Sequence, residues 1–497
     1  MQNDVTIFLQ PIGKELSVIK NTPLIDILHE FGVEFPCGGK GTCGRCKVKL
    51  LKGDLPVDPV QQAKIDKLQL GPEWRLACYC NCESDITLEI SQLESIILAD
   101  NSDFDFSPQE GYGIAVDLGT TTLVVQVVDL QNGSVIDVET AVNPQVKFGS
   151  DVISRIQSAL EGNQESLINA IRSKIADMVN ALLRKHPVNP QHAVIVGNTA
   201  MHHLFCGLPV QSLSFYPFES PYLHEYPFRA VTLGWNVKEE CQVLFYPSIG
   251  SFVGSDILAG IAATKMFEKE NYSILIDLGT NGEIVLGNRN HILCASTAAG
   301  PAFEGAKISQ GMRATTGAIS SVSDKSGGLN CHVIGNTVAS GICGSGLIDA
   351  MSVFLANGVI GDFGEINSGE EKLRLRDNVW LTQQDIREFQ LAKAAIAAGL
   401  QILLNKTGIT FSEVETIYIA GGFGNFINEE NLVTTGIIET DPGKIQKMGN
   451  TALIGAKMFL FRGEELTRKI LKICSHINLE SDPDFQDIYI WKMAFAT

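Results

Sequence analysis

The sequence lacks a run of about eighteen apolar residues, a basic leader and an excess of positive charge. Without such a run we expect no membrane-spanning helix. The segment from Met1 has no basic region followed by an apolar stretch, so we expect no signal peptide. The 38 basic and 56 acidic residues give a formal net charge of −18, which disfavours nucleic acid and anionic membranes as partners.

Twelve cysteines without a secretion signal indicate a reducing compartment, in which thiols bind metals or fill cores. We therefore expect a cytoplasmic protein. The length of 497 residues is enough for about two to four domains.

Four of the cysteines follow the spacing of a [2Fe–2S] site. The text Cys37-Gly-Gly-Lys-Gly-Thr-Cys43-Gly-Arg-Cys46 is followed downstream by Arg-Leu-Ala-Cys78. Glycines between the first cysteines let the backbone fold close to the sulfides, and backbone amides can donate to sulfur. The first gap holds five residues instead of the four of the plant-type pattern. The sequence predicts that Cys37, Cys43, Cys46 and Cys78 bind a [2Fe–2S] cluster.

A zinc site is the alternative for these cysteines. Zinc sites favour two matched Cys-x-x-Cys pairs, and only Cys43 and Cys46 have that spacing. Cys80 and Cys82 lie near Cys78, but the Arg-Leu-Ala context favours Cys78 as the ligand, so we expect these two to be bystanders.

Changes in composition divide the chain into five segments. Residues 1–92 predict a small ferredoxin-like domain of the β-grasp type, a sheet wrapped over one helix, and the acidic stretch 93–110 predicts a linker. From residue 111 onward, β-rich apolar runs alternate with helical segments, which indicates an α/β architecture. We expect one half at 111–268, a second at 269–463 and a tail at 464–497.

One motif occurs twice, about one domain length apart. Ile114-Ala-Val-Asp-Leu-Gly-Thr-Thr-Thr122 recurs as Ile274-Leu-Ile-Asp-Leu-Gly-Thr-Asn-Gly282, each time between two apolar runs. The duplication predicts two related halves with a cleft between them. Tight glycine turns let backbone amides approach a phosphate chain, and threonine hydroxyls add donors. The candidate phosphate-binding residues are Gly119, Thr120, Thr121, Gly279, Thr280 and Asn281.

The aspartates of the two turns are candidates for holding a metal ion. Asp117 and Asp277 end their strands, and their carboxylates can hold the waters of a Mg²⁺ ion that bridges phosphates. A third element, an apolar strand that runs into Gly421, Gly422 and Gly424, suits an adenosine ring lying against the backbone. Two phosphate turns followed by this segment predict ATP as the nucleotide.

Residues 111–463 resemble the ATPase superfamily of actin, sugar kinases and heat-shock chaperones, which share two ribonuclease-H-like halves. Several segments carry a resemblance to a narrower group within this superfamily. They include Val196-Gly-Asn-Thr-Ala-Met-His202, Phe252-Val-Gly-Ser-Asp256, Gly341-Ile-Cys-Gly-Ser-Gly346 and Thr382-Gln-Gln-Asp385. Together with the N-terminal cysteines, the chain is similar to ATP-dependent reductive activators of corrinoid proteins.

The resemblance implies an ATP-hydrolysing electron-transfer enzyme. Such an activator passes an electron from its cluster to the inactive Co(II) state of a corrinoid protein and restores Co(I) for methyl transfer. The implied partners are a corrinoid protein of a methyltransferase system and an unidentified electron donor, and the family suggests a homodimer.

The residue that orients the attacking water stays open on the sequence. Asp117, Asp277 and Glu304 are the catalytic candidates, and Asp256 and Glu283 are rivals of Glu304. Three other functions are also open: an activator of a radical dehydratase or another low-potential redox enzyme, a small-molecule kinase with an accessory cluster, and a nucleotide-gated redox module.

Overall fold

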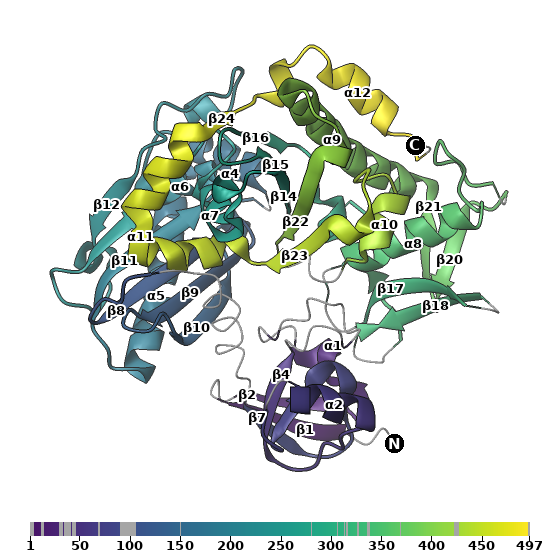
Figure 1. Ribbon diagram of the computed structural model, residues 1–497, viewed down its shortest axis with the longest axis horizontal. Helices are drawn as coiled ribbons and strands as arrows, with labels where there is room; N and C mark the ends of the chain where they lie inside the picture. Colours follow the sequence, from purple (N-terminus) through teal and green to yellow (C-terminus); the bar gives the residue numbers. More distant parts are fainter. Residues whose placement is uncertain are drawn as a thin grey trace.

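The computed structural model describes residues 4–10, 14–28, 33, 41, 46–67, 70–89, 106–149, 151–279, 281–305, 307–312, 314, 317–325, 328–334, 338–367, 369–421 and 427–495. It confirms the multidomain α/β class, with a small N-terminal module and two larger halves (Figure 1). No helix within these residues is long and apolar enough to cross a bilayer.

The N-terminal module is a five-stranded sheet in the order β2-β1-β7-β4-β5. In β1, Val5, Ile7 and Leu9 point inward because alternate side chains of a strand share one face. The chain returns beside β1 as the parallel strand β7. The elements are β1 (Asp4–Gln10), β2 (Lys14–Ile19), β3 (Thr22–Pro23), α1 (Leu24–Leu28), β4 (Lys47–Lys52), α2 (Pro59–Lys67), β5 (Trp74–Leu76), β6 (Asn81–Cys82) and β7 (Ile86–Glu89).

The first half is built on a six-stranded sheet in the order β10-β9-β8-β11-β13-β12. Strands β8 and β9 form an antiparallel hairpin, and β11 runs parallel to β8 on its other side. The strands are β8 (Tyr112–Leu118), β9 (Thr122–Asp129), β10 (Val135–Val142), β11 (Pro190–Gly197), β12 (Tyr226–Arg229) and β13 (Gln242–Phe245). The helices are α4 (Val152–Ser158), α5 (Gln164–Lys185), α6 (Thr199–Cys206) and α7 (Ser255–Thr264).

The second half repeats this arrangement in the sheet β23-β22-β14-β15-β16-β24. Strands β14 and β15 form the corresponding antiparallel hairpin, and β22 runs parallel to β14. The strands are β14 (Tyr272–Leu278), β15 (Gly282–Gly287), β16 (Ile292–Thr297), β22 (Val414–Ala420), β23 (Ile445–Gly449) and β24 (Cys474–His476). The repeated Asp-Leu-Gly-Thr text thus occupies the same hairpin in two related sheets.

Smaller strands and further helices complete the second half. Strands β17 (Ala318–Lys325), β18 (Gly328–Val333) and β19 (Gly341–Ile342) form one small sheet, and β20 (Lys372–Arg376) pairs with β21 (Val379–Thr382). The helices are α8 (Gly344–Ala356), α9 (Gln383–Thr407), α10 (Glu429–Thr434), α11 (Thr451–Ile473) and α12 (Phe485–Lys492).

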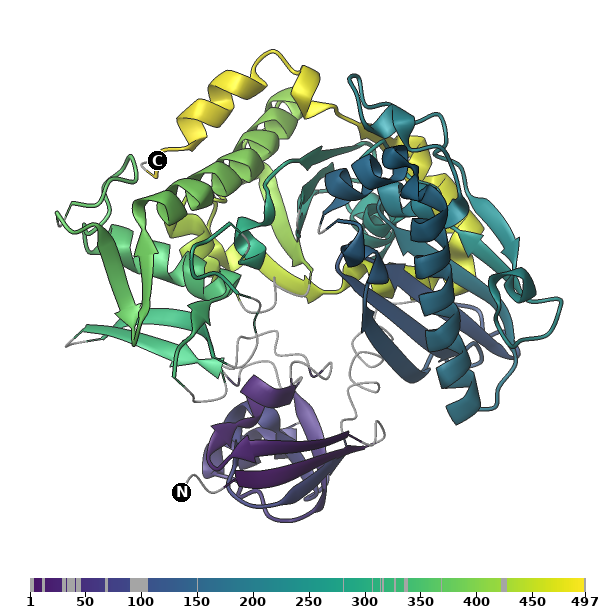
Figure 2. The ribbon, with the colours of Figure 1, turned by 180° about the vertical axis from the view of Figure 1, so that it is seen from behind.

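The C-terminal segment connects the two halves. The boundary expected at residue 463 falls inside α11, which leaves the second sheet and packs on α7 and β8 of the first half. After α11, β24 pairs with β16 and α12 packs on α9, so the chain returns to the second half. In both ribbon views the N-terminal module lies below the two halves, with α1 facing them (Figures 1 and 2).

Candidate functional site

Two of the four predicted cluster ligands lie within the described residues, and they converge. Cys46 directly precedes β4, and Cys78 lies in the short 3-10 helix Ala77–Tyr79 that follows β5. Their sulfur atoms are 3.2 Å apart. The Ala77 amide donates to the Cys46 carbonyl at 2.7 Å, which holds the two segments together. Cys37 and Cys43 lie outside the described residues.

The neighbouring cysteines have a different environment. Burial raises the pKa of Cys80 to about 12, and the Cys80 sulfur lies 3.6 Å from the Leu76 carbonyl oxygen. Burial also raises the pKa of Cys82 to about 11, and its thiol donates to the Ser84 carbonyl at 3.5 Å. Because the thiolate is the form that binds iron, these shifts disfavour Cys80 and Cys82 as ligands.

The first phosphate turn joins β8 to β9. The Gly119 amide donates to the Thr122 carbonyl at 3.1 Å, and a Cβ at position 119 would lie 2.6 Å from that oxygen, so the turn needs glycine. Two asparagines brace it: Asn143 donates to the Gly119 carbonyl and Asn198 to the Thr120 hydroxyl, each at 2.9 Å. The backbone N–H of Asn143 also donates to the Thr121 carbonyl.

The second turn joins β14 to β15, and here the Gly279 amide donates to the Asn281 carbonyl at 3.1 Å, one residue nearer along the chain than the acceptor in the first turn. Thr280 lies outside the described residues. The adenosine segment begins at Gly421, where β22 ends with φ at +89°. A Cβ there would lie 2.9 Å from Asp277 Oδ1, so glycine lets the backbone approach this carboxylate. Gly422 and Gly424 lie outside the described residues.

Four carboxylates share the space between the two turns. Asp117 and Asp277 are the last residues but one of β8 and β14, Asp256 lies in the first turn of α7, and Glu283 is the cross-strand partner of Asp277 in β15. Asn450 Nδ2 donates to Asp117 Oδ2 at 2.7 Å. These side chains come from both halves of the protein, so the carboxylate centre exists only in the folded chain.

Burial and mutual repulsion make this centre hard to ionise. Burial raises the pKa of Asp117 to about 6, and the Asn450 hydrogen bond pulls it down. Burial, followed by the charge of Asp117, raises the pKa of Asp277 to about 7. Burial raises the pKa of Asp256 to about 7 and that of Glu283 well above its ordinary value, with neighbouring carboxylates adding to both shifts. A nearby cation would favour the ionised forms.

Mg²⁺ is the cation that the sequence predicts at this site. No three His, Cys, Asp or Glu side chains within the described ranges form a direct metal-binding group. Mg²⁺ usually keeps several waters and takes one or two carboxylates together with substrate phosphates. A Mg²⁺ ion coordinated in this way would suit a site in which turns that can bind phosphates lie beside separate carboxylates.

Glu304 ends the 3-10 helix Pro301–Glu304, and its side chain lies outside what the structure describes. Its role therefore stays a prediction. Sequence reasoning missed Asn450, although a signal was present. Gly449-Asn-Thr-Ala452 repeats Gly197-Asn-Thr-Ala200, and in each copy the asparagine begins a helix beside the first phosphate turn.

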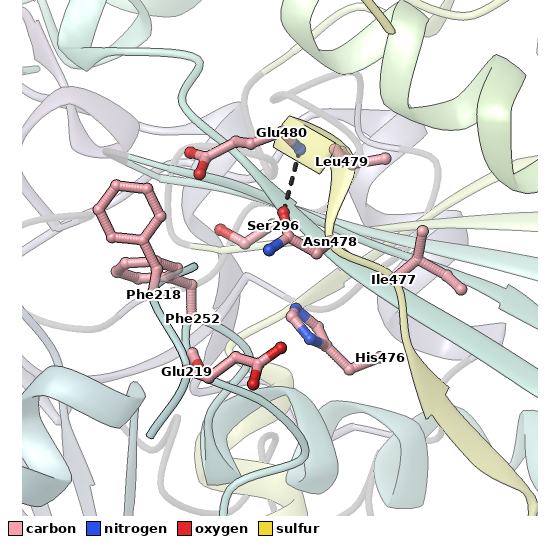
Figure 3. Close-up of a pocket in the computed structure, with 10 residues that line it drawn as sticks. Phe218, Glu219, Phe252, Ser296, His476, Ile477, Asn478, Leu479 and Glu480 are labelled. Atoms are coloured by element: carbon pink, nitrogen blue, oxygen red, sulfur yellow. Dashed lines mark hydrogen bonds between the residues drawn. The ribbon is translucent and has the colours of Figure 1, made fainter. Parts of the chain in front are cut away.

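A small pocket opens between the two halves (Figure 3). Phe218 and Glu219 line it from the first half, and Ser296 and His476 line it from the second. Figure 3 shows the Glu219 carboxylate directed toward the His476 ring. The Ser296 hydroxyl donates to Glu283 at 3.4 Å. The pocket therefore adjoins the carboxylate centre. Because both halves line it, its shape depends on their relative position.

The fold and site define a class of protein: an iron–sulfur module joined to a two-half ATPase. Family models match the 2Fe-2S iron-sulfur cluster binding domain at residues 7–83, the RACo middle region at 112–269 and the C-terminal domain of RACo, the ASKHA domain, at 271–497. The chain belongs to the RACo family of reductive activators of corrinoid proteins.

Named relatives and a solved structure agree with this family. The corrinoid activation enzyme RamQ of Eubacterium limosum is 34% identical over 81% of this chain and 74% of its own length. The [Co(II) methylated amine-specific corrinoid protein] reductase of Methanosarcina barkeri is 26% identical over 78% and 77%. The solved reductive activator for corrinoid, iron-sulfur protein is 27% identical, with a TM-score of 0.68 over 99% of this chain and 98% of that one.

Proposed function

We propose that this protein uses ATP to drive one electron from its [2Fe–2S] cluster to the Co(II) state of a corrinoid protein, which returns to Co(I). Each turnover oxidises the cluster by one electron, reduces one cobalt by one electron and hydrolyses ATP to ADP and phosphate. The observation that carries the proposal is that one chain holds both a converging cysteine pair and a duplicated Asp-Leu-Gly-Thr hairpin with carboxylates from both halves beside it. The names of the relatives support the cobalt substrate.

At the electron-carrying end, Cys46 and Cys78 would hold the cluster together with Cys37 and Cys43. When bound, the cluster supplies a single low-potential electron. The described residues shape its surroundings: Cys46 is buried, Cys78 is half-buried, and α1 packs on the turn that carries Cys78. We propose that a separate one-electron donor reloads this module.

At the nucleotide end, the two turns would hold the phosphates and Gly421 would admit the adenosine. The amides of Gly119 and Gly279 close the turns by donating to the carbonyls of Thr122 and Asn281, and the Thr120 hydroxyl, which accepts from Asn198, keeps its own proton to donate. When bound, Mg²⁺ neutralises phosphate charge, and Asp117 and Asp277 would hold its waters. Glu304 stays our proposed residue for orienting the attacking water.

Energy coupling explains why the two ends share a chain. Plant-type clusters have potentials near roughly −400 mV, and each 100 mV of uphill transfer costs about 2.3 kcal/mol per electron. ATP can drive such a step only if its binding or hydrolysis distinguishes two conformational states. The site is made from two halves that α11 connects, so a change in their separation would provide these states.

The test mixes the reduced holoprotein with candidate Co(II) corrinoid proteins of methyltransferase systems and follows Co(I) absorbance. We expect Co(I) with ATP and little with a non-hydrolysable analogue or without nucleotide. Cys46→Ser should abolish reduction and keep nucleotide binding. If no corrinoid partner gave an ATP-dependent signal, the proposal would be wrong.

Two further parts of the proposal concern the state of the protein. We propose the cytoplasm as its compartment, because a [2Fe–2S] protein with twelve cysteines suits a reducing compartment, where thiols stay available to metals. We also propose a homodimer, which light scattering of the holoprotein would test directly.

A further inference from the structure

The repeated Gly-Asn-Thr-Ala segments point to a residue beyond the phosphate turns. We infer that Asn450 is a positioning residue for the nucleotide: its amide holds the Asp117 carboxylate in place and ties it to the helix that crosses between the halves. The inference deepens the proposed function, because it rests on Asp117 serving the metal-bound nucleotide.

Asn450 makes two hydrogen bonds with opposite ends of its amide group. Its Oδ1 accepts from the Leu453 amide at 2.8 Å, which caps the N-terminus of α11. Its Nδ2 donates to Asp117 Oδ2 at 2.7 Å. The cap fixes the plane of the side chain, so the direction of the donor follows the first turn of α11. The carboxylate of Asp117 is thereby held by a helix that begins more than three hundred residues later.

Asn198 provides a matched comparison in the other copy of the segment. Its Oδ1 accepts from the Met201 amide at 2.9 Å and caps α6, while its Nδ2 donates to the Thr120 hydroxyl at 2.9 Å. In both copies, therefore, the asparagine oxygen caps a helix and the side-chain nitrogen donates to the hairpin that carries the first phosphate turn. They differ in the acceptor, because only Asn450 holds a carboxylate.

Asn450 also occupies the point where the chain changes halves. Gly449 ends β23, and its carbonyl accepts from the Gly421 amide at 3.0 Å, at the start of the adenosine segment. The next residues begin α11, which packs on β8 and α7. The packing is close: a Cβ at Gly455 of α11 would lie 2.1 Å from the Ala259 carbonyl of α7. A movement of the second half is thus transmitted through Asn450 to the Asp117 carboxylate.

This geometry predicts which quantity depends on Asn450. Without the amide, Asp117 loses the donor that orients one of its oxygens. Hydrogen bonds to charged groups are strong enough that we expect the loss to weaken Mg²⁺-dependent binding of nucleotide about ten- to hundredfold. Nucleotide binding in the absence of Mg²⁺ should change much less.

The test uses Asn450→Ser, because serine also caps helices but is too short to reach Asp117. Binding of ADP to the holoprotein is measured by calorimetry across a Mg²⁺ titration, and ATP hydrolysis is measured in parallel. We expect the half-saturating Mg²⁺ concentration to rise about ten- to hundredfold and the thermal midpoint without nucleotide to stay near that of the unchanged protein. The cluster absorbance should also stay the same.

Two variants separate this inference from its alternatives. Asn198→Ser keeps a helix cap but loses the donor to Thr120 in the other copy, and we expect it to shift binding equally with and without Mg²⁺. Asn450→Asp keeps the cap but sets a carboxylate against Asp117, so it should weaken Mg²⁺-dependent binding even if the serine variant folds poorly. An unchanged Mg²⁺ dependence in the folded Asn450 variants would overturn the inference. An unchanged Mg²⁺ dependence in Asp117→Asn would instead overturn the proposed role of the turn.

Discussion

One contact joins the iron–sulfur module to the ATPase and can be broken by a single substitution. His332 Nε2 in β18 lies 3.2 Å from Asp26 Oδ2 in α1, while His332 Nδ1 lies 3.0 Å from the Ser320 hydroxyl. The Asp26 side chain is only 4% exposed, whereas that of His332 is 37% exposed. Because α1 packs on the turn that carries Cys78, this ion pair helps to hold the cluster module against the ATPase.

Replacing His332 with alanine leaves a buried carboxylate oxygen without its cation. Leaving a buried polar group without its partner costs about 1–3 kcal/mol in general. Because solvent screens the partly exposed imidazole, we expect the docking free energy to weaken by about 1–2 kcal/mol, the lower part of that range. This corresponds to a five- to thirtyfold weaker docking equilibrium between the module and the ATPase. The double variant Asp26→Asn with His332→Ala should recover most of the loss, because a neutral amide needs no cation.

The contact should also depend on pH in a definite direction. The bond to Asp26 raises the pKa of His332 above its ordinary 6.5, while burial and Arg376 oppose the shift. A raised pKa in the docked state means that the stabilisation is fully present below about 6.5 and is lost as pH rises through the docked-state value. Docking should therefore be tighter in mild acid than in mild base.

Small-angle scattering of the holoprotein at about pH 6 and about pH 8.5 measures this equilibrium. We expect the radius of gyration to increase with pH, and His332→Ala to be expanded at both values. His291→Ala, which removes an exposed histidine elsewhere, is the matched control. The reasoning would be refuted if His332→Ala and the unchanged protein gave the same scattering at both values.

Three further predictions concern the cluster, the carboxylate centre and the adenosine segment. Cys46→Ser should lose the visible absorbance of the cluster and keep its affinity for ATP; loss of both would contradict the separation of the two ends. Burial and Asp117 raise the pKa of Asp277 from 3.8 to about 7, so nucleotide-free protein should lose stability as pH rises from about 4 to about 7. Asp277→Asn should flatten this slope in thermal melts, and an unchanged slope would argue against the shift. Gly421→Ala places a Cβ 2.9 Å from Asp277 Oδ1 at a φ of +89°, and we expect about tenfold weaker ATP binding. Gly408→Ala, with a φ of +74° and no atom within 4 Å of its Cβ, carries the same strain without the contact and should leave ATP affinity unchanged.

Much of the fold could be predicted because its signals are local. The alternation of apolar residues in β1 and the duplicated strand–turn–strand text of β8–β9 and β14–β15 depend on neighbours within one hairpin. The same holds for α9, which begins at the Thr382 capping box and ends at Gly408, as its capping and glycine signals indicate. The tail was harder, because the pairing of β24 with β16 joins segments far apart in the chain.

By itself, the sequence determined the kinds of chemistry in this protein: the spacing of Cys37, Cys43, Cys46 and Cys78, and the two Asp-Leu-Gly-Thr turns. Both are patterns within short segments, whose geometry follows from turn and thiolate chemistry. Tertiary structure alone decided that four carboxylates from the two halves lie near one another, that Asn450 reaches Asp117 and that Asp26 meets His332. The first two arrangements require strands of both halves to end near one another and α11 to cross between the halves, and the third requires α1 to lie against β18. No local period in a sequence records which distant segments will pack together.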